Sequence, residues 1–127
     1  MTARQLPLLG VVILAAMVAG APAASAHSFP MAENPGAGQT LDASPSEVSI
    51  KYDAPIEKLF AKLEVLDASG ANEAIGQPVF GADGYTLSIK LSRLKPGEYT
   101  VKWGVLCVDT HRTEGSYRFI VAAKGNP

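Results

Sequence analysis

Short segments in which apolar and polar residues alternate one by one recur along the chain from residue 47 to residue 122. Successive side chains of a β-strand point to opposite faces, so a period of two predicts strands with one buried face. Val48, Ile50 and Tyr52 fall on one face of such a segment, and Ser49 and Lys51 on the other. The predicted strands are Glu47–Asp53, Leu59–Asp67, Gln77–Phe80, Tyr85–Leu91, Glu98–Val108 and Glu114–Ala122, preceded by a short edge segment within Ser28–Gly38.

Glycine, proline and aspartate separate these segments. Asp83-Gly84 has hairpin-turn chemistry, and Leu94–Gly97 places proline before glycine, as a type II turn prefers. This pattern predicts an all-β fold, an immunoglobulin-like Greek-key antiparallel β-sandwich of about seven strands, with a small closed barrel as the alternative. A helix over Ile56–Leu66 is the competing local prediction, because Leu, Glu, Lys and Ala are good helix formers. Trp103 is expected in the core between the sheets.

The first 26 residues have the layout of a secretory signal peptide. Arg4 precedes the apolar run Leu6–Ala21, which is too short for a membrane span, and Ala24-Ser25-Ala26 is an A-x-A cleavage signal. An N-terminal membrane anchor is the alternative interpretation. We therefore predict a leader at 1–26 and one mature domain at 27–127 that works outside the cytoplasm and begins with His27.

The charge balance argues against a nucleic-acid-binding protein, and the cysteine content excludes a domain stabilised by disulfides. Removal of the leader takes away one cation, Arg4, of the 11 Lys and Arg residues, and leaves 10 against 12 Asp and Glu residues. A mildly acidic domain without a basic stripe gives no electrostatic support for nucleic-acid binding. Cys107 is the single cysteine, so no intramolecular disulfide can form, and burial alone must stabilise the fold.

Metal-ligating side chains gather at two places in the sequence. Asp109 and His111 are two residues apart, so in a strand they would project to the same face. The other histidine, His27, would carry both a free α-amine and an imidazole after cleavage, and these two nitrogens can chelate one metal. Three nitrogens and one carboxylate oxygen favour Cu(II), with Zn(II) as the rival. An ordinary loop histidine and an unstructured terminal residue are the alternative interpretations of His111 and His27.

Cys107 shares the parity of this pair, and a thiolate beside a metal would change the redox behaviour of the site. We expect instead a small buried side chain on the core face. Thr110, Arg112, Thr113 and Glu114 are candidates for orienting the imidazole through its second nitrogen.

The sequence also resembles the CopC-like copper-binding proteins of the bacterial periplasm. The resemblance spans nearly the whole mature chain and is carried by His27, Pro35-x-x-Gly38, Ser44-Pro45-x-Glu47-Val48, Leu94-x-Pro96-Gly97-x-Tyr99-x-Val101-x-Trp103 and Val108-Asp109-x-His111-x-x-x-Gly115-x-Tyr117-x-Phe119. It implies a seven-stranded Greek-key fold that binds Cu(II) through the N-terminal histidine and both residues of the D-x-H motif. Those roles fall on His27, Asp109 and His111.

Two departures from the family pattern limit the expectation. Met31 is the only methionine after the leader, so we predict no separate Cu(I) site, which would need soft thioether ligands. Some members of the family have a metal-ligating glutamate at the position of Ala54, which cannot bind a metal. The neighbouring Asp53 should face the other way, so we predict no additional carboxylate ligand from this segment.

The resulting prediction is a monomeric, periplasmic Cu(II)-binding protein, not an enzyme. It would sequester copper or deliver it to a partner such as an inner-membrane copper transporter. The alternatives are a copper monooxygenase that uses an N-terminal histidine brace, and a structural β-sandwich module without a metal.

Overall fold

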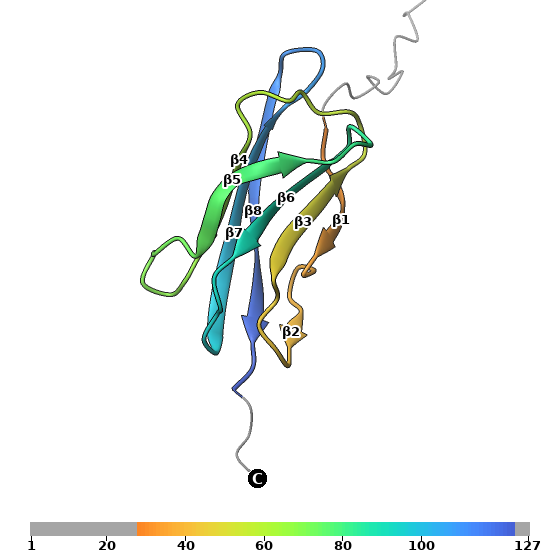
Figure 1. Ribbon diagram of the computed structural model, residues 1–127. Coiled ribbons are helices and arrows are strands. Elements are labelled where there is room, and N and C mark those ends of the chain that lie inside the picture. Colours follow the sequence, from red (N-terminus) through yellow and green to blue (C-terminus); the bar gives the residue numbers. More distant parts are fainter. Residues whose placement is uncertain (1–27, 124–127) are drawn as a thin grey trace, which may run out of the picture.

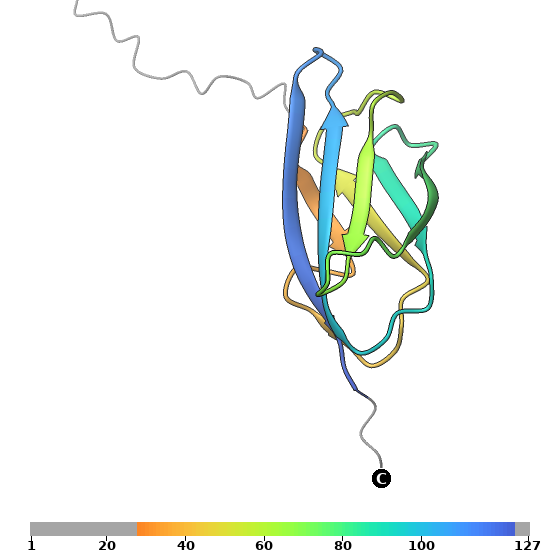
Figure 2. The ribbon, with the colours of Figure 1, turned by 90° about the vertical axis from the view of Figure 1, so that its left-hand side faces the viewer.

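The computed structural model describes residues 28–123, which form two four-stranded β-sheets packed face to face (Figures 1 and 2). The strand order is β1-β3-β6-β5 in one sheet and β2-β8-β7-β4 in the other. The strands are β1 (Pro30–Asn34), β2 (Thr40–Leu41), β3 (Glu47–Tyr52), β4 (Lys62–Leu66), β5 (Ala74–Phe80), β6 (Thr86–Leu91), β7 (Gly97–Leu106) and β8 (Arg112–Val121). The all-β sandwich prediction is therefore confirmed.

The core lies between the two sheets and is built from the faces that the alternation marked as apolar. Val48, Ile50 and Tyr52 of β3 are fully buried. Trp103 of β7 is 7% exposed, and its ring meets that of Tyr52 edge to face, with centroids 5.4 Å apart. Burial of each such side chain stabilises the fold by about 1.5–3 kcal/mol. The other buried apolar side chains are Ile56, Leu63, Val65, Leu87, Ile89, Leu91, Leu94, Tyr99, Val101, Val105, Cys107, Tyr117, Phe119 and Val121.

The structure differs from the sequence-based prediction at several strand boundaries. It has eight strands rather than about seven, because β2 adds a two-residue parallel pairing with β8 in an otherwise antiparallel fold. The helix considered over Ile56–Leu66 does not form, and β4 begins at Lys62 rather than Leu59. Leu59, expected on the buried face, is 58% exposed, since it lies in the loop before the strand. β7 ends at Leu106, two residues before the predicted boundary.

The loops gather at two ends of the sandwich. The hairpin end, at the top of Figure 1, holds Ser28 and Phe29, the loop 53–61, the loop 81–85 and the β7–β8 hairpin loop 107–111. The opposite end, which we call the groove end, holds the loops 42–46, 67–73 and 92–96.

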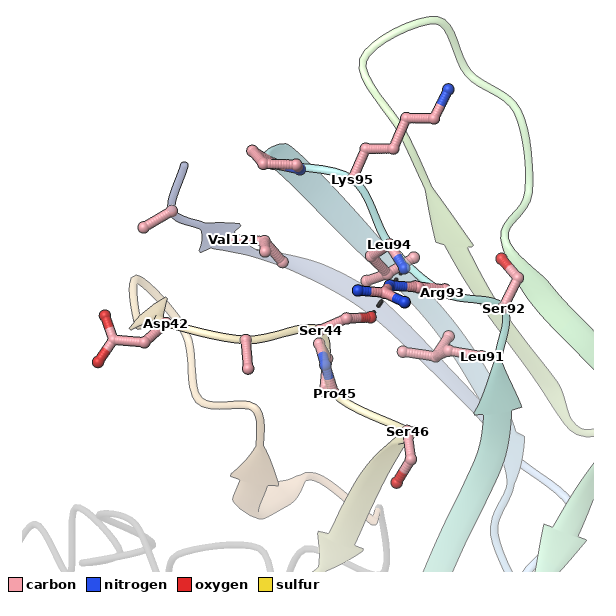
Figure 3. A pocket seen from close by; sticks show the side chains of 13 residues that line it. Asp42, Ser44, Pro45, Ser46, Leu91, Ser92, Arg93, Leu94, Lys95 and Val121 are labelled. Atoms are coloured by element: carbon pink, nitrogen blue, oxygen red, sulfur yellow. Dashed lines mark hydrogen bonds between the residues drawn. The ribbon is translucent and has the colours of Figure 1, made fainter. Parts of the chain in front are cut away.

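A groove with a volume of about 840 Å³ gives the groove end its name (Figure 3). Its lining combines apolar and hydroxyl side chains with the charged residues Asp42, Arg93 and Lys95. The Leu94 N–H donates to Ser44 Oγ at 2.7 Å, which ties the loop 42–46 to the loop 92–96.

Candidate metal centre

The Asp109–His111 pair lies in the tight loop that joins β7 to β8. The Cys107 N–H donates to the His111 carbonyl at 2.7 Å, and the Thr110 N–H donates to the Cys107 carbonyl at 2.9 Å. Thr110 has a φ of 74°. These bonds pair Cys107 with His111 and close a three-residue turn, residues 108–110, at the tip of the hairpin loop. The last of the three, Thr110, has the left-handed conformation that glycine usually adopts at this position.

The loop brings the two candidate ligands into direct contact. Asp109 Oδ2 lies 2.9 Å from His111 Nδ1, and the backbone N–H of His111 donates to Asp109 Oδ1 at 3.1 Å. The predicted proximity is confirmed, but the predicted cause is wrong. Both residues lie beyond the end of β7, so the turn, and not strand alternation, places them together. The His111 side chain is 66% exposed and that of Asp109 28%, which leaves the pair accessible to a metal from solution.

Cys107 does not share this exposure, although it has the same parity in the sequence. Its side chain is fully buried, and its Sγ accepts a hydrogen bond from the Ser28 N–H at 3.1 Å. Thr113 Oγ1 lies 3.9 Å from the same sulfur. The interpretation of Cys107 as a small core side chain is confirmed, and its thiol is engaged in holding the start of the domain.

Ser28 is fixed against the base of the hairpin loop by three contacts. Besides the bond from its N–H to Cys107, its Oγ donates to the Pro55 carbonyl at 3.0 Å, and Thr113 Oγ1 donates to the Ser28 carbonyl at 2.7 Å. Ser28 is fully buried. The chain that enters the domain is therefore anchored beside the hairpin loop.

The next residue strengthens the anchor. The Phe29 N–H donates to Asp53 Oδ1 and the Asp53 N–H donates to the Phe29 carbonyl, both at 2.8 Å. His27 and the predicted leader 1–26 lie outside the described residues.

Ser28 and Thr113 have a shared structural role that the sequence did not reveal. Thr113 was one of four candidates for orienting the imidazole, but its hydroxyl holds Ser28 instead. Arg112, another candidate, donates through Nη1 to the Phe60 carbonyl at 3.2 Å. The imidazole nitrogen Nδ1 is contacted by Asp109. Because Ser28 and Thr113 are 85 residues apart, no local signal in the sequence could have linked them.

The tyrosines beneath this end are not suited to metal binding. Burial raises the pKa of Tyr52 and of Tyr117 well above the ordinary tyrosine range, and the nearby Glu33 carboxylate raises both further. Their hydroxyls therefore stay protonated near neutral pH. Within residues 28–123, no three His, Cys, Asp or Glu side chains are grouped so that they could hold a metal together.

Comparison with known proteins places the chain in a family. The CopC domain model matches residues 31–122. The chain belongs to the CopC family. The crystal structure of CopC from Methylosinus trichosporium OB3b is similar over 80% of this chain and 99% of that one, with 32% sequence identity and a TM-score of 0.69. PcoC, a copper resistance protein from Escherichia coli, is 22% identical over 73% of this chain and 98% of its own, with a TM-score of 0.67, and supports the shared fold.

Two curated relatives differ in how much of their length corresponds to this CopC-like chain. Protein YobA from Escherichia coli K12 is 29% identical over 122 residues, which cover 94% of this chain and 97% of YobA. The copper transport protein CutJ from Bacillus subtilis is 24% identical over 98 residues, 76% of this chain but 18% of CutJ. The family resemblance found in the sequence is thus confirmed. Among the described residues, no helix has the length and apolar character needed to span a membrane.

Proposed function

We propose that this CopC-family protein binds Cu(II) in the periplasm through His27, Asp109 and His111, and that it sequesters the ion or delivers it to a membrane copper transporter. Membership of the family and the similarity to a copper transport protein support a role in copper handling. The oxidation state, the ligands, the compartment and the partner are the further steps of the proposal.

The observation that carries the proposal is the anchoring of Ser28. Three hydrogen bonds join Ser28 to Cys107, Pro55 and Thr113, all next to the loop that holds Asp109 and His111. The described part of the chain therefore begins beside the two candidate ligands. Cleavage after Ala26 would make His27, the preceding residue in the sequence, an N-terminal histidine with an amine and an imidazole to add to the pair.

The geometry of the pair suits a metal bound by both side chains. Asp109 Oδ2 and His111 Nδ1 lie 2.9 Å apart, close enough for both to bind one metal that replaces the hydrogen bond between them. The same contact also suits a second arrangement, in which Asp109 holds Nδ1 and His111 binds through Nε2. In the first arrangement the pair supplies one nitrogen and one oxygen ligand, and in the second it supplies the His111 nitrogen while Asp109 orients the ring.

The donor set favours Cu(II) over Cu(I). Cu(I) prefers thioether and thiolate ligands. The thiol of Cys107 is buried and accepts the Ser28 hydrogen bond, so it can reach a metal only if that anchor opens. Met31, the single methionine among the described residues, lies alone on β1. We therefore propose one Cu(II) site and no separate Cu(I) site.

We further propose that the protein is not a monooxygenase. A monooxygenase that acts on polysaccharides needs a flat aromatic surface, and the aromatic side chains of this sandwich are mostly in the core. Among the described residues, Phe29 and Phe60 are the exposed aromatic side chains. Two phenylalanines on different segments are too few to make such a platform.

The decisive experiment compares two forms of the mature protein that differ by one residue. One begins at His27, and the other keeps Ala26, which converts the histidine amine into a peptide bond and leaves every side chain unchanged. Titration followed by electron paramagnetic resonance should show one Cu(II) per chain for the first form. The Cu(II) affinity of the second form should fall by more than roughly 100-fold, because loss of an outer-shell partner alone lowers metal affinity roughly 10–100-fold.

Two variants complete the test. His111→Ala should lose affinity by at least as much, whereas Arg93→Ala, at the groove end, should bind like the wild type. Equal affinity of the His27 and Ala26 forms would show that the amine is not a ligand, and unchanged binding by His111→Ala would refute the site as a whole.

A further inference from the structure

Three buried oxygen atoms on three different strands have no hydrogen-bond partner within residues 28–123. They are Glu33 Oε2 on β1, the Tyr52 hydroxyl on β3 and the Tyr117 hydroxyl on β8. The Tyr52 side chain is fully buried and Tyr117 is 9% exposed. A buried polar group without a partner destabilises a fold and is rare in proteins, so three such groups need a physical explanation.

Strand pairing turns Glu33 and Tyr52 toward the interior of the sandwich. Glu33 lies opposite Ile50 in the antiparallel pairing of β1 with β3. Residues that lie opposite one another on neighbouring strands point to the same face, and Ile50 is fully buried between the sheets. Tyr52 is two residues farther along β3, on that same face. Both side chains therefore point from adjacent strands toward the other sheet (Figure 1).

Tyr117 approaches the same place from the other sheet. The Tyr52 ring packs edge to face on Trp103, and the Trp103 ring lies so close to Gly115 that a Cβ there would be 2.7 Å from Cζ2. Tyr117 follows Gly115 by two residues on β8, so it points to the same face of that sheet. Burial is the main cause that raises the pKa of both tyrosines, and the charge of Glu33 raises both further, which requires that it is nearby. The three oxygen atoms therefore lie in one region between the sheets.

The chemistry of the three groups limits what can join them. Each tyrosine hydroxyl stays protonated near neutral pH and can donate one hydrogen bond, and Glu33 Oε2 can accept one. The joining group must therefore accept two hydrogen bonds and donate one. A water molecule does both, and buried waters make about three hydrogen bonds to groups that would otherwise be unpaired. A metal cation has no hydrogen to donate, and two neutral phenols with one carboxylate are a poor set of ligands for it.

We propose that Glu33, Tyr52 and Tyr117 form an internal binding site for one water molecule, which accepts hydrogen bonds from both tyrosine hydroxyls and donates one to Glu33 Oε2. This water joins β1 and β3 of one sheet to β8 of the other. Glu33 is only half-buried and lies on the outermost strand of its sheet, so solvent reaches the site from the edge of the sandwich. The water accounts for the hydroxyl at position 117, whereas the fully buried Phe119 fills the core without one. The site does not depend on the proposed function.

Removal of one hydroxyl distinguishes a hydrated tyrosine from an unpaired one by the sign of the effect. If the Tyr117 hydroxyl is bonded to water, Tyr117→Phe removes a hydrogen bond, and the folding equilibrium constant from urea titration should fall about tenfold. If the hydroxyl is unpaired, the same substitution removes a buried unsatisfied group and the constant should rise. Tyr99→Phe is the matched control, because the Tyr99 hydroxyl donates to the Lys95 carbonyl at 2.5 Å and its loss should also lower the constant.

The two tyrosines should not act independently. Tyr52→Phe alone should also lower the folding equilibrium constant about tenfold. Because both hydroxyls bind the same water, Tyr52→Phe/Tyr117→Phe should lose clearly less than the product of the two single losses. Losses that multiply fully, or a Tyr117→Phe variant that is more stable than the wild type, would contradict a shared water.

A high-resolution crystal structure of the protein, grown with a rubidium salt, identifies the ligand directly. We expect a water peak within hydrogen-bond distance of Glu33 Oε2 and both tyrosine hydroxyls, without an anomalous rubidium signal, and no such peak in Tyr52→Phe/Tyr117→Phe. Direct contact among the three side chains, an absence of density between them, a rubidium signal at the site, or a water that persists in the double variant would each overturn the proposal.

Discussion

The two ends of the sandwich meet the same backbone requirement in different ways. At the groove end, the loop between β4 and β5 reaches a positive φ of 88° with Gly70, which has no Cβ to clash. At the hairpin end, Gly84 does the same in one loop, but the two loops nearest the candidate ligands place Phe60 and Thr110 at positive φ. These are the two non-glycine residues of that kind in the described part of the chain. These strained positions lie in the two loops beside the candidate site, and such strain is common where function constrains a loop.

The ends also differ in what they offer a ligand. The groove end has a hollow of about 840 Å³ lined by Arg93, Lys95 and Asp42, whereas the hairpin end has a carboxylate–imidazole pair whose imidazole is exposed. A large concave pocket is the usual first guess for a binding site. A metal ion needs ligand atoms at the right separation and does not need a large cavity. For a metal ion, the Asp109–His111 pair is therefore a better candidate site than the groove.

The largest change in stability is expected from Gly115→Ala, in the half of β8 nearer the hairpin end. A Cβ at this position would lie 2.7 Å from Trp103 Cζ2. Trp103 is packed against Tyr52, so its ring cannot move aside, and we expect the free energy of unfolding to fall by about 3 kcal/mol. Thermal unfolding measures the loss.

Gly104→Ala is the matched control for Gly115→Ala. There the nearest atom is the flexible end of Arg112, at 2.6 Å, and the loss should stay under about 0.5 kcal/mol. Equal losses for the two variants would show that Trp103 is not rigidly held.

Thr113→Val should come next and should link stability to copper binding. The substitution keeps the shape but removes the hydroxyl that donates to the buried Ser28 carbonyl. An unpaired buried carbonyl costs about 1.5 kcal/mol of unfolding free energy. Because Ser28 anchors the N-terminal segment, we expect a drop in Cu(II) affinity of about tenfold as well, of the order produced by loss of a supporting contact.

Two variants sharpen this prediction. Thr113→Ser keeps the hydroxyl and should retain the affinity. Ser44→Ala removes the acceptor of the Leu94 N–H at the groove end, so it should lower stability and leave copper binding unchanged. If Ser44→Ala weakened copper binding as much as Thr113→Val, the two ends would not be functionally distinct.

The alternation of apolar and polar residues was sufficient to predict the fold, because burial between two sheets is decided strand by strand. Segments without that signal were missed. β2 has two residues, and its pairing with β8 joins positions 80 apart. The end of β7 was misplaced because Val108 and Thr110 are β-branched, as strand residues often are, and the loop has no glycine at its left-handed position.

The candidate site could be predicted as residues but not as a structure. Asp109 and His111 are recognisable from their chemistry, yet their contact arises from the turn. The Ser28 anchor depends on Cys107 and Thr113, which no periodic pattern connects to the start of the domain. Tertiary hydrogen bonds of this kind leave no trace in local sequence.

Substitutions at positions of positive φ should change the free energy of unfolding by a smaller amount, with opposite signs at the two ends. Glycine replaces a larger residue at the hairpin end, and a larger residue replaces glycine at the groove end. Thr110→Gly removes the left-handed strain of a β-branched residue, which exceeds the entropy cost of glycine, so the free energy of unfolding should rise by about 0.5–1 kcal/mol. Gly70→Ala introduces that strain at the groove end and should lower it by about 1 kcal/mol. A destabilised Thr110→Gly variant would mean that the threonine side chain makes up for its own strain, and the contrast between the ends would lose its basis.

The smallest effect concerns a feature that the two ends share. Asp67 in the groove-end loop and Asp83 in a hairpin-end loop both accept hydrogen bonds from nearby residues, Ser69 and Ala71 for the first and Tyr85 and Thr86 for the second. These hydrogen bonds lower the pKa of both carboxyl groups below the ordinary value of 3.8. The bond from the Ser69 hydroxyl contributes most for Asp67, and the bond from the Tyr85 backbone N–H contributes most for Asp83.

A carboxyl group whose pKa is lower in the folded state stabilises the fold above pH 3.8, and that contribution is lost as the pH falls through the folded-state pKa. Asp67→Asn and Asp83→Asn should therefore each lower the Tm slightly at pH 7 and match the wild type near the acid end of a pH series. Because both loops use the same chemistry, the two variants should behave alike. A Tm difference that persists unchanged into acid would show that the charge is not the cause, and a clear effect at only one end would extend the contrast between the ends from strain and ligands to acid stability.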